Sequence, residues 1–162
     1  MRLRQRRLRK LGIDEAANWP RLTPGDASRP RVLVEVKDPA EADSYWRFLG
    51  RHGYDVSWCP GPSATSSCVL VEEGHCPLVE QADIVLTALN PDDVHAKPVL
   101  EHLHEPDCMK PIIAVGRRTR WNEFLDRFKV LEPVRVRRDL LPALDVADRS
   151  RQLLRSLLDP RA

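Results

Sequence analysis

The chain of 162 residues is predicted to be an α/β protein built on a parallel sheet. Short apolar segments alternate with amphipathic helical segments from Arg31 onward. Strands that are apolar along their whole length are typical of a parallel sheet covered by helices on both faces. The hydrophobic fraction of 42% and the charged fraction of 31% belong to an ordinary globular chain. We therefore expect one α/β domain over 31–162, preceded by an arm and linker over 1–30.

The first strand and helix carry the clearest boundary signals. Residues 32–36 form a short apolar strand, and Asp38 is expected to cap the helix that follows, with Pro39 at its first position. Glu41 stands three residues after the cap, as in a capping box. The further strands are predicted over 54–59, 83–89, 111–116 and 129–133, and the further helices over 93–104, 117–128 and 139–158.

The connection between the second and third strands departs from this pattern. Residues 60–75 are rich in Pro, Gly and Ser and are predicted to be a long loop, with a short extended piece at 69–71. Pro77 to Gln81 can supply little more than one helical turn. Leu70 and Leu78 are the apolar side chains expected to hold this segment against the sheet.

Five strands joined by helices predict the flavodoxin-like order 2-1-3-4-5. In such a sheet the chain winds outward in both directions from the first strand. Any ligand then binds where the direction reverses, beyond the carboxyl ends of strands 1 and 3. We therefore place the candidate site after residues 36 and 88.

Residues 31–134 resemble a bacterial response-regulator receiver domain. The resemblance rests on the strand order, on Asp38-Pro39 after the first strand, and on the Glu132-Pro133 ending of the fifth. A receiver has an acidic pair, a phospho-accepting Asp, a Ser/Thr switch residue and a Lys. The matching positions here hold Val36 and Lys37, Ala88, Gly116 and Glu132. Mg²⁺ needs hard oxygen ligands and phosphorylation needs a carboxylate nucleophile, so the resemblance implies a pseudo-receiver that is not phosphorylated.

This resemblance implies a non-enzymatic signalling or regulatory module that needs no cofactor and acts through protein contacts. In receivers the face made by helix 4, strand 5 and helix 5 carries partner contacts or dimerisation. The matching segments 117–128 and 139–158 are rich in Leu and Arg. We expect a protein partner or a homodimer there, although plain packing explains the same composition.

Three cysteines give the first alternative, a metal- or redox-sensing module. Cys59, Cys68 and Cys76 lie within 18 residues together with His75, and thiolates of this kind bind Zn²⁺ or an iron–sulfur cluster. Their spacing is wider than a Cys-x₂-Cys knuckle, so a disulfide and unmodified structural thiols also remain open. Reduced, metal-free thiols are the favoured interpretation.

Other titratable clusters are expected to be surface residues. This holds for His95, His102, His104 and Cys108 around the third helix. Two arginine groups flank strands 4 and 5, where either an anion pocket or solvated charge fits: Arg117, Arg118 and Arg120, then Arg135, Arg137 and Arg138.

The basic arm gives the second alternative, a nucleic-acid-binding accessory protein. Residues 1–12 hold six basic and no acidic residues, so the other 150 residues carry 20 basic and 24 acidic ones. Clustered guanidinium groups bind phosphates by releasing counterions. The residues concerned are Arg2, Arg4, Arg6, Arg7, Arg9 and Lys10. A solvated tail is the competing interpretation.

The sequence shows no apolar run of the length that a membrane-spanning helix needs. The basic N-terminal residues lack the apolar stretch of a secretory signal. Four cysteines in a chain of this kind are typical of free thiols in a reducing compartment. We therefore expect a cytoplasmic protein.

Overall fold

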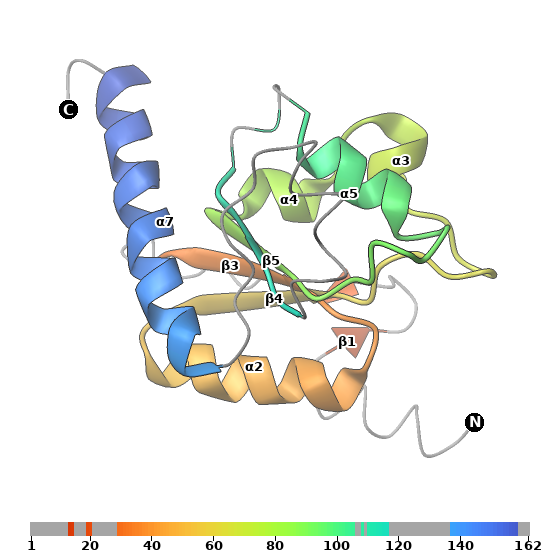
Figure 1. Cartoon of the computed structure of the whole chain (residues 1–162), viewed down its shortest axis with the longest axis horizontal. Helices are drawn as coiled ribbons and strands as arrows, with labels where there is room; N and C mark the ends of the chain where they lie inside the picture. The colour runs from red at the N-terminus through yellow and green to blue at the C-terminus, as the bar shows by residue number, and fades with distance from the viewer. Residues whose placement is uncertain are drawn as a thin grey trace.

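The computed structural model describes residues 13–14, 19–20, 29–105, 108, 110–116 and 137–158. Its main sheet has four strands, β3 (Arg31–Glu35), β4 (Asp55–Cys59), β5 (Ile84–Thr87) and β6 (Ile112–Ala114). All neighbours are parallel, in the order β4-β3-β5-β6 (Figure 1). This order confirms the predicted 2-1-3-4 arrangement. The described sheet has four strands and not the five predicted, and the segment predicted as the fifth, 129–133, lies outside the described residues.

Helices cover both faces of the sheet, as the apolar strands predicted. Alternate residues of β3 point to opposite faces, so Val32 and Val34 pack on one side and Leu33 on the other. The first face is covered by α2 (Pro39–Arg51) and α7 (Arg137–Leu158). The second is covered by α3 (Val69–Glu73), α4 (Pro77–Gln81) and α5 (Lys97–Leu103) (Figure 1).

Helix α2 begins where the capping signal predicted. Asp38 is its N-cap, and the Asp38 side chain accepts a hydrogen bond of 2.9 Å from the backbone N–H of Ala40. Pro39 stands in the first turn, where a missing N–H costs nothing. Ala42, Tyr45 and Leu49 form its buried face, and helical spacing places them in one stripe.

The cysteine segment contains two short helices where the sequence predicted a loop and one helical turn. Cys68 and Cys76 each stand at the N-cap position of a five-residue helix, and neither side chain makes a capping hydrogen bond. The extended piece predicted at 69–71 is wrong, because these residues open α3. Leu70 and Leu78 are buried, which confirms them as the apolar anchors of the segment.

Two further helices begin at different residues from those predicted. Helix α5 starts at Lys97 instead of Asp93, because Pro98 belongs to its first turn and the preceding residues form turns. Helix α7 starts at Arg137, two residues before the predicted Asp139. Pro142 therefore lies inside α7 and not in its first turn, where a start at Asp139 would place it. The helix predicted over 117–128 lies outside the described residues.

A small antiparallel pair lies within the predicted arm. Strand β1 (Ile13–Asp14) pairs with β2 (Trp19–Pro20), and β2 lies beside β4 at the edge of the main sheet. The sequence analysis predicted no strand in the arm and linker over 1–30. The six basic residues of the arm lie outside the described part of the chain.

Candidate regulatory site at the carboxyl edge of the sheet

The strand register brings the predicted site residues together. Glu35 and Thr87 are register partners on β3 and β5, and the N–H of Ala88 donates to the Glu35 carbonyl over 2.8 Å. Val36 and Lys37 therefore leave β3 beside the point where Ala88 leaves β5. Gly116 follows Val115, whose N–H donates to the Thr87 carbonyl over 2.8 Å. Glu132, the remaining candidate, lies outside the described residues.

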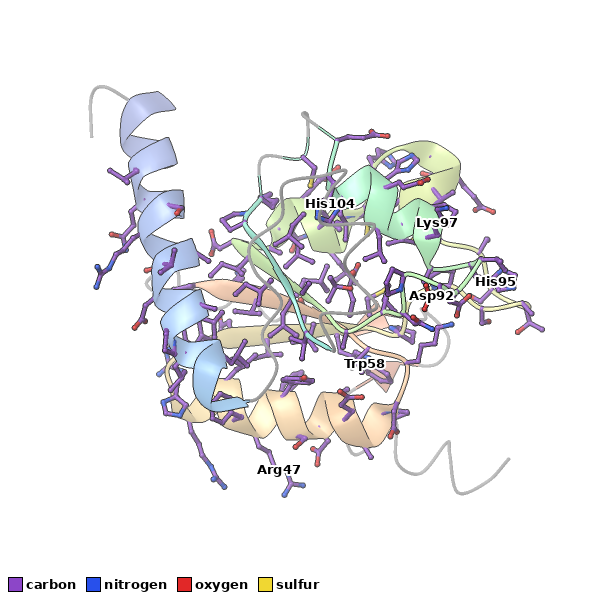
Figure 2. All side chains as sticks on the ribbon, in the orientation of Figure 1. Arg47, Trp58, Asp92, His95, Lys97 and His104 are labelled. Carbon is purple, nitrogen blue, oxygen red and sulfur yellow. The ribbon has the colours of Figure 1, made fainter. Side chains whose placement is uncertain are left out.

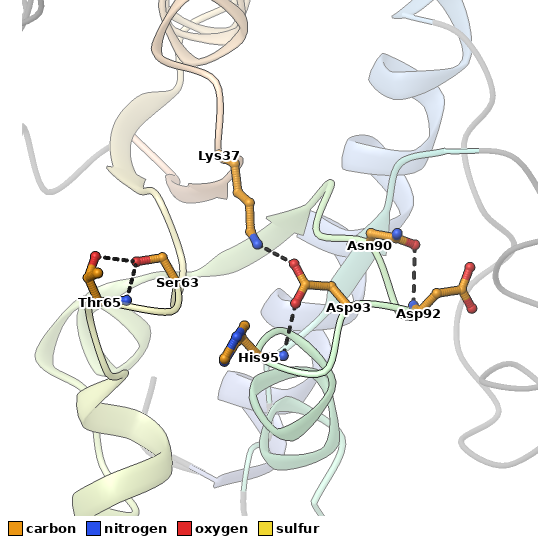
Figure 3. Close-up of polar contacts among 7 residues, drawn as sticks. All are labelled: Lys37, Ser63, Thr65, Asn90, Asp92, Asp93 and His95. Carbon is orange, nitrogen blue, oxygen red and sulfur yellow. Dashed lines mark hydrogen bonds and ion pairs between the residues drawn. The ribbon is translucent and has the colours of Figure 1, made fainter.

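Lys37 and Asp93 form an ion pair across this edge (Figure 3). Asp93 lies in the turn that leads into α5, 56 residues away in the sequence. Its second oxygen accepts a hydrogen bond of 2.9 Å from the N–H of His95. The hydrogen bond from the Lys37 side chain lowers the pKa of Asp93 below its usual value. The ion pair thus joins the segments that follow β3 and β5.

Apolar groups occupy the other matching positions. Val36 is buried, and its carbonyl accepts a hydrogen bond of 2.7 Å from the indole N–H of Trp58, which lies inside the molecule (Figure 2). Ala88 packs against the same apolar cluster. Neither position supplies an oxygen ligand from its side chain, and the carboxylate of Asp93 is neutralised by Lys37. The ammonium group of Lys37 repels a divalent cation at this point of the edge.

Glu35 is an acidic residue that the sequence analysis missed. Its side chain is only 2% exposed, on the face of the sheet covered by α3, α4 and α5. Burial raises the pKa of Glu35 to about 7, and a hydrogen bond with the Thr87 side chain partly offsets that rise. Its Oε2 atom has no hydrogen-bond partner. The sequence feature that could have identified Glu35 is its position as an acidic residue within the apolar strand predicted over 32–36.

Cys59 at the end of β4 and the two cysteines of the segment that follows it, Cys68 and Cys76, lie on the same face. Cys59 and Cys76 are buried, Cys68 is half-buried, and all are free thiols. Burial raises the pKa of Cys59, and the neighbouring charge of Glu35 raises it further. The side chain of His75 is 61% exposed and lies 3.5 Å from a carboxylate oxygen of Glu73. Within the described part of the chain, no three His, Cys, Asp or Glu residues are grouped so that they could hold a metal ion.

The histidines of the α5 region are only partly on the surface. His95 is exposed and points outward, as predicted (Figure 2). His102 and His104 are half-buried, which corrects the prediction of solvated side chains. Their Nδ1 atoms lie 3.1 Å from the Pro98 carbonyl and 2.6 Å from the Leu100 carbonyl, one helical turn earlier. Cys108 is half-buried too. The predicted arginine pocket lies outside the described residues, except for the backbone of Arg137 and Arg138 in α7.

None of the helices that the structure describes has both the length and the apolar content to cross a bilayer.

Comparison with solved structures finds a likeness in fold. The chain resembles the non-phosphorylated HemR receiver domain from Leptospira biflexa, with a TM-score of 0.50 and 17% sequence identity. The match covers 74% of this chain and 94% of the HemR domain. No protein-family model and no curated protein sequence matches the chain. The likeness to the HemR domain shows that this chain has a receiver-like fold.

Proposed function

We propose that this protein is a non-enzymatic, receiver-like regulatory module of the cytoplasm that acts through protein contacts and is not phosphorylated. The observation that carries the proposal is the Lys37–Asp93 ion pair at the carboxyl edge of the sheet. It lies beyond the carboxyl ends of the adjacent strands β3 and β5. The chain continues from β3 to one edge of the sheet and from β5 to the other, and an α/β sheet of this order binds its ligand at this point. The receiver-like fold supports a signalling module. The residues at the carboxyl edge support the proposal that the protein is not phosphorylated.

Two physical effects oppose phosphoryl chemistry at this edge. The ammonium group of Lys37 repels a divalent cation and neutralises Asp93, so Mg²⁺ meets a positive charge in place of a ligand. Ala88 offers a methyl group where a nucleophilic carboxylate is required. The charge at the position of Lys37 and Asp93 is therefore set by the chain itself and is independent of a phosphodonor.

Phosphorylation is tested by incubating the protein with acetyl phosphate and Mg²⁺ and then measuring its intact mass. We expect no added phosphoryl group and no Mg²⁺-dependent change in tryptophan fluorescence, while a phosphorylatable receiver treated alongside acquires the adduct. A stoichiometric, acid-labile phosphoryl adduct on this chain would contradict the proposal.

The partner surface is proposed to include α7 and the segment 117–128. Val146 and Leu153 are 53% and 65% exposed. A separation of seven residues places them on the same side of the helix, while Leu140, Leu144 and Ala147 face the sheet. The exposed pair gives a protein partner, or a second copy of the chain, an apolar strip to cover.

Charge on this strip should disrupt the association. The pair Val146→Asp and Leu153→Asp is expected to abolish self-association, or capture of a partner, measured by sedimentation and pull-down. Val94→Asp is the matched control, because Val94 is 76% exposed in the turn before α5 and lies off the strip. Equal behaviour of the two variants would show that α7 is not the contact surface.

The thiols give less support to the metal- or redox-sensing alternative. The thiolate form binds metals and reacts with oxidants. Burial raises the pKa of Cys59 and of Cys68, so little thiolate is present at neutral pH. After anaerobic purification we expect four titratable thiols and no stoichiometric zinc or iron. One equivalent of metal that is lost in Cys68→Ser would favour the sensor instead.

A further inference from the structure

We propose that Glu35 is a proton-binding site whose ionisation opens the contact between the segments that follow β4 and β5. It is the only buried Asp, Glu, Lys, Arg or His among the described residues. One of its oxygens finds no hydrogen-bond partner within the part of the chain that the structure describes. The inference concerns the face of the sheet opposite to α7 and does not depend on the proposed function.

The surroundings of Glu35 favour the neutral carboxyl group. Cys59 of β4 and Thr87 of β5 are its register partners. The thiols whose pKa is raised by the charge of Glu35 are those of Cys59, of Cys68 at the start of α3, and of Cys108. Burial is the larger cause of the raised pKa of each thiol, so these groups are uncharged near neutral pH.

Among the residues that the structure describes, no cation compensates the charge of an ionised Glu35. The causes that set its pKa are burial and the Thr87 hydrogen bond, with no contribution from a lysine, arginine or histidine. The side chain of Lys37 is 45% exposed and pairs with Asp93 instead. A buried carboxylate without a cation and with a single hydroxyl partner is costly, so it must either bind a proton or gain access to water.

A contact between Gly61 and Leu89 closes this face at the ends of the strands. Gly61 follows β4 and Leu89 follows β5, so the contact crosses the end of β3, which lies between them. A Cβ atom placed on Gly61 would lie 2.9 Å from Cδ2 of Leu89. The two segments therefore approach so closely that only glycine fits at position 61.

The neighbours of Glu35 hold both sides of this contact. The N–H of Gly61 donates to the Cys59 sulfur over 3.4 Å, and the N–H of Leu89 donates to the Thr87 hydroxyl over 3.3 Å. The Thr87 oxygen accepts from Leu89, so the hydroxyl proton of Thr87 remains available to Glu35. An ionised Glu35 needs water in addition, and water that reaches it between Cys59 and Thr87 has to separate the Gly61 and Leu89 segments. The carboxyl edge is therefore closed when Glu35 is protonated and opens when it ionises.

The first test measures the proton directly. In protein labelled with ¹³C at the glutamate side-chain carboxyl groups, one signal should titrate with a midpoint near 7, against roughly 4.3 for ordinary glutamates. That signal should be missing in Glu35→Gln and present in Glu72→Gln, which removes an exposed carboxyl group of α3. A Glu35 signal that titrates in the ordinary range would overturn the proposal.

The second test measures the opening. Cys59 is buried below the Gly61–Leu89 contact, so its alkylation rate reports access to this face. We expect the ratio of Cys59 labelling in wild type to that in Glu35→Gln to rise several-fold with a midpoint near 7, read by peptide mass spectrometry. Taking the ratio at each pH removes the part of the thiol ionisation that both proteins share. The charge of Glu35 raises the pKa of Cys59 in wild type, which acts against the expected rise and cannot produce it. A ratio that stays flat while Glu35 titrates would overturn the coupling, and the wild-type titration remains decisive if the variant does not fold.

Discussion

Two charged residues that lie close together in the sequence occupy opposite environments. Glu35 ends β3 inside the molecule and has no cation beside it among the described residues, whereas Lys37 reaches the surface and pairs with Asp93. A buried charge lowers the free energy of unfolding, whereas an exposed ion pair changes it little. The two residues should therefore respond in different ways to pH and to mutation.

Glu35 should make the protein less stable as the pH rises. Its pKa is about 7 in the folded protein against 4.5 for an ordinary glutamate, so the folded state binds the proton more tightly. The contribution of Glu35 to the free energy of unfolding is then highest below pH 4.5, falls between 4.5 and about 7, and is level above. The total loss is on the order of 3 kcal/mol.

Urea unfolding at a series of pH values measures this loss. Glu35→Gln cannot ionise, so the part of the pH dependence that Glu35 causes should disappear. Glu72→Gln, which alters an exposed carboxyl group, should keep it. Identical slopes for wild type and Glu35→Gln would contradict the expectation.

Gly61→Ala should destabilise the protein, and Gly50→Ala should not. Gly61 has a φ of +69°, and its new methyl group would collide with the buried Leu89 side chain. The left-handed conformation alone costs roughly 1–2 kcal/mol for a residue with a Cβ atom. Gly50 lies in α2 with nothing near its Cβ position, so alanine should stabilise by about 0.5–1 kcal/mol. Thermal unfolding of both variants compares them, and equal melting temperatures would show that the Gly61 segment is not tightly packed.

The repeated sequence of the cysteine segment makes two similar elements. Cys68 and Cys76 each precede a short helix that buries one leucine, and Gly74, with a φ of +73°, ends the first helix. The sequence analysis predicted the two leucine anchors. It missed α3 because a helix this short has little intrinsic stability, and the packing of Leu70 decides whether it forms.

Leu78→Ala should destabilise the protein far more than a change on the exposed side of α4. Leu78 is buried among residues of the cluster under α4 and α5, so truncation leaves a cavity and costs about 2–5 kcal/mol. Glu80→Ala is the control, because its side chain is exposed on the same helix. Chemical unfolding of both measures the difference. A small effect of Leu78→Ala would show that the segment is loosely held.

At the scale of the whole molecule, the hydrophobic periodicity of the sequence predicted those features of the fold that depend on local sequence. The order of the first four strands and the start of α2 followed from apolar runs and from the cap at Asp38. The Lys37–Asp93 pair could not be predicted, because it joins residues 56 apart that meet only when β3 and β5 are adjacent. The burial of Glu35 has the same origin, since it requires the helices on one face to be in place.

The last prediction concerns residues 1–28, which we expect to be dispensable for folding. The basic part of the arm has too little apolar surface to offset an ordering cost of roughly 1–2 kcal/mol per residue. A chain that begins at Ser28 should melt within a few degrees of the full chain. The pair β1–β2 is the feature that tests this, because β2 lies beside the edge strand β4.

A second truncation separates the two parts of the arm. A chain that begins at Gly12 keeps β1 and β2 and loses all six basic residues. If only the chain from Ser28 melts much lower, then β2 stabilises the sheet edge and the domain begins near Gly12. If the basic residues bind nucleic acid, only the full chain should bind, and its affinity should fall steeply with salt, because clustered guanidinium groups bind phosphates by releasing counterions. Melting thus tests the role of β2 at the sheet edge, while the salt dependence of binding tests the basic residues independently.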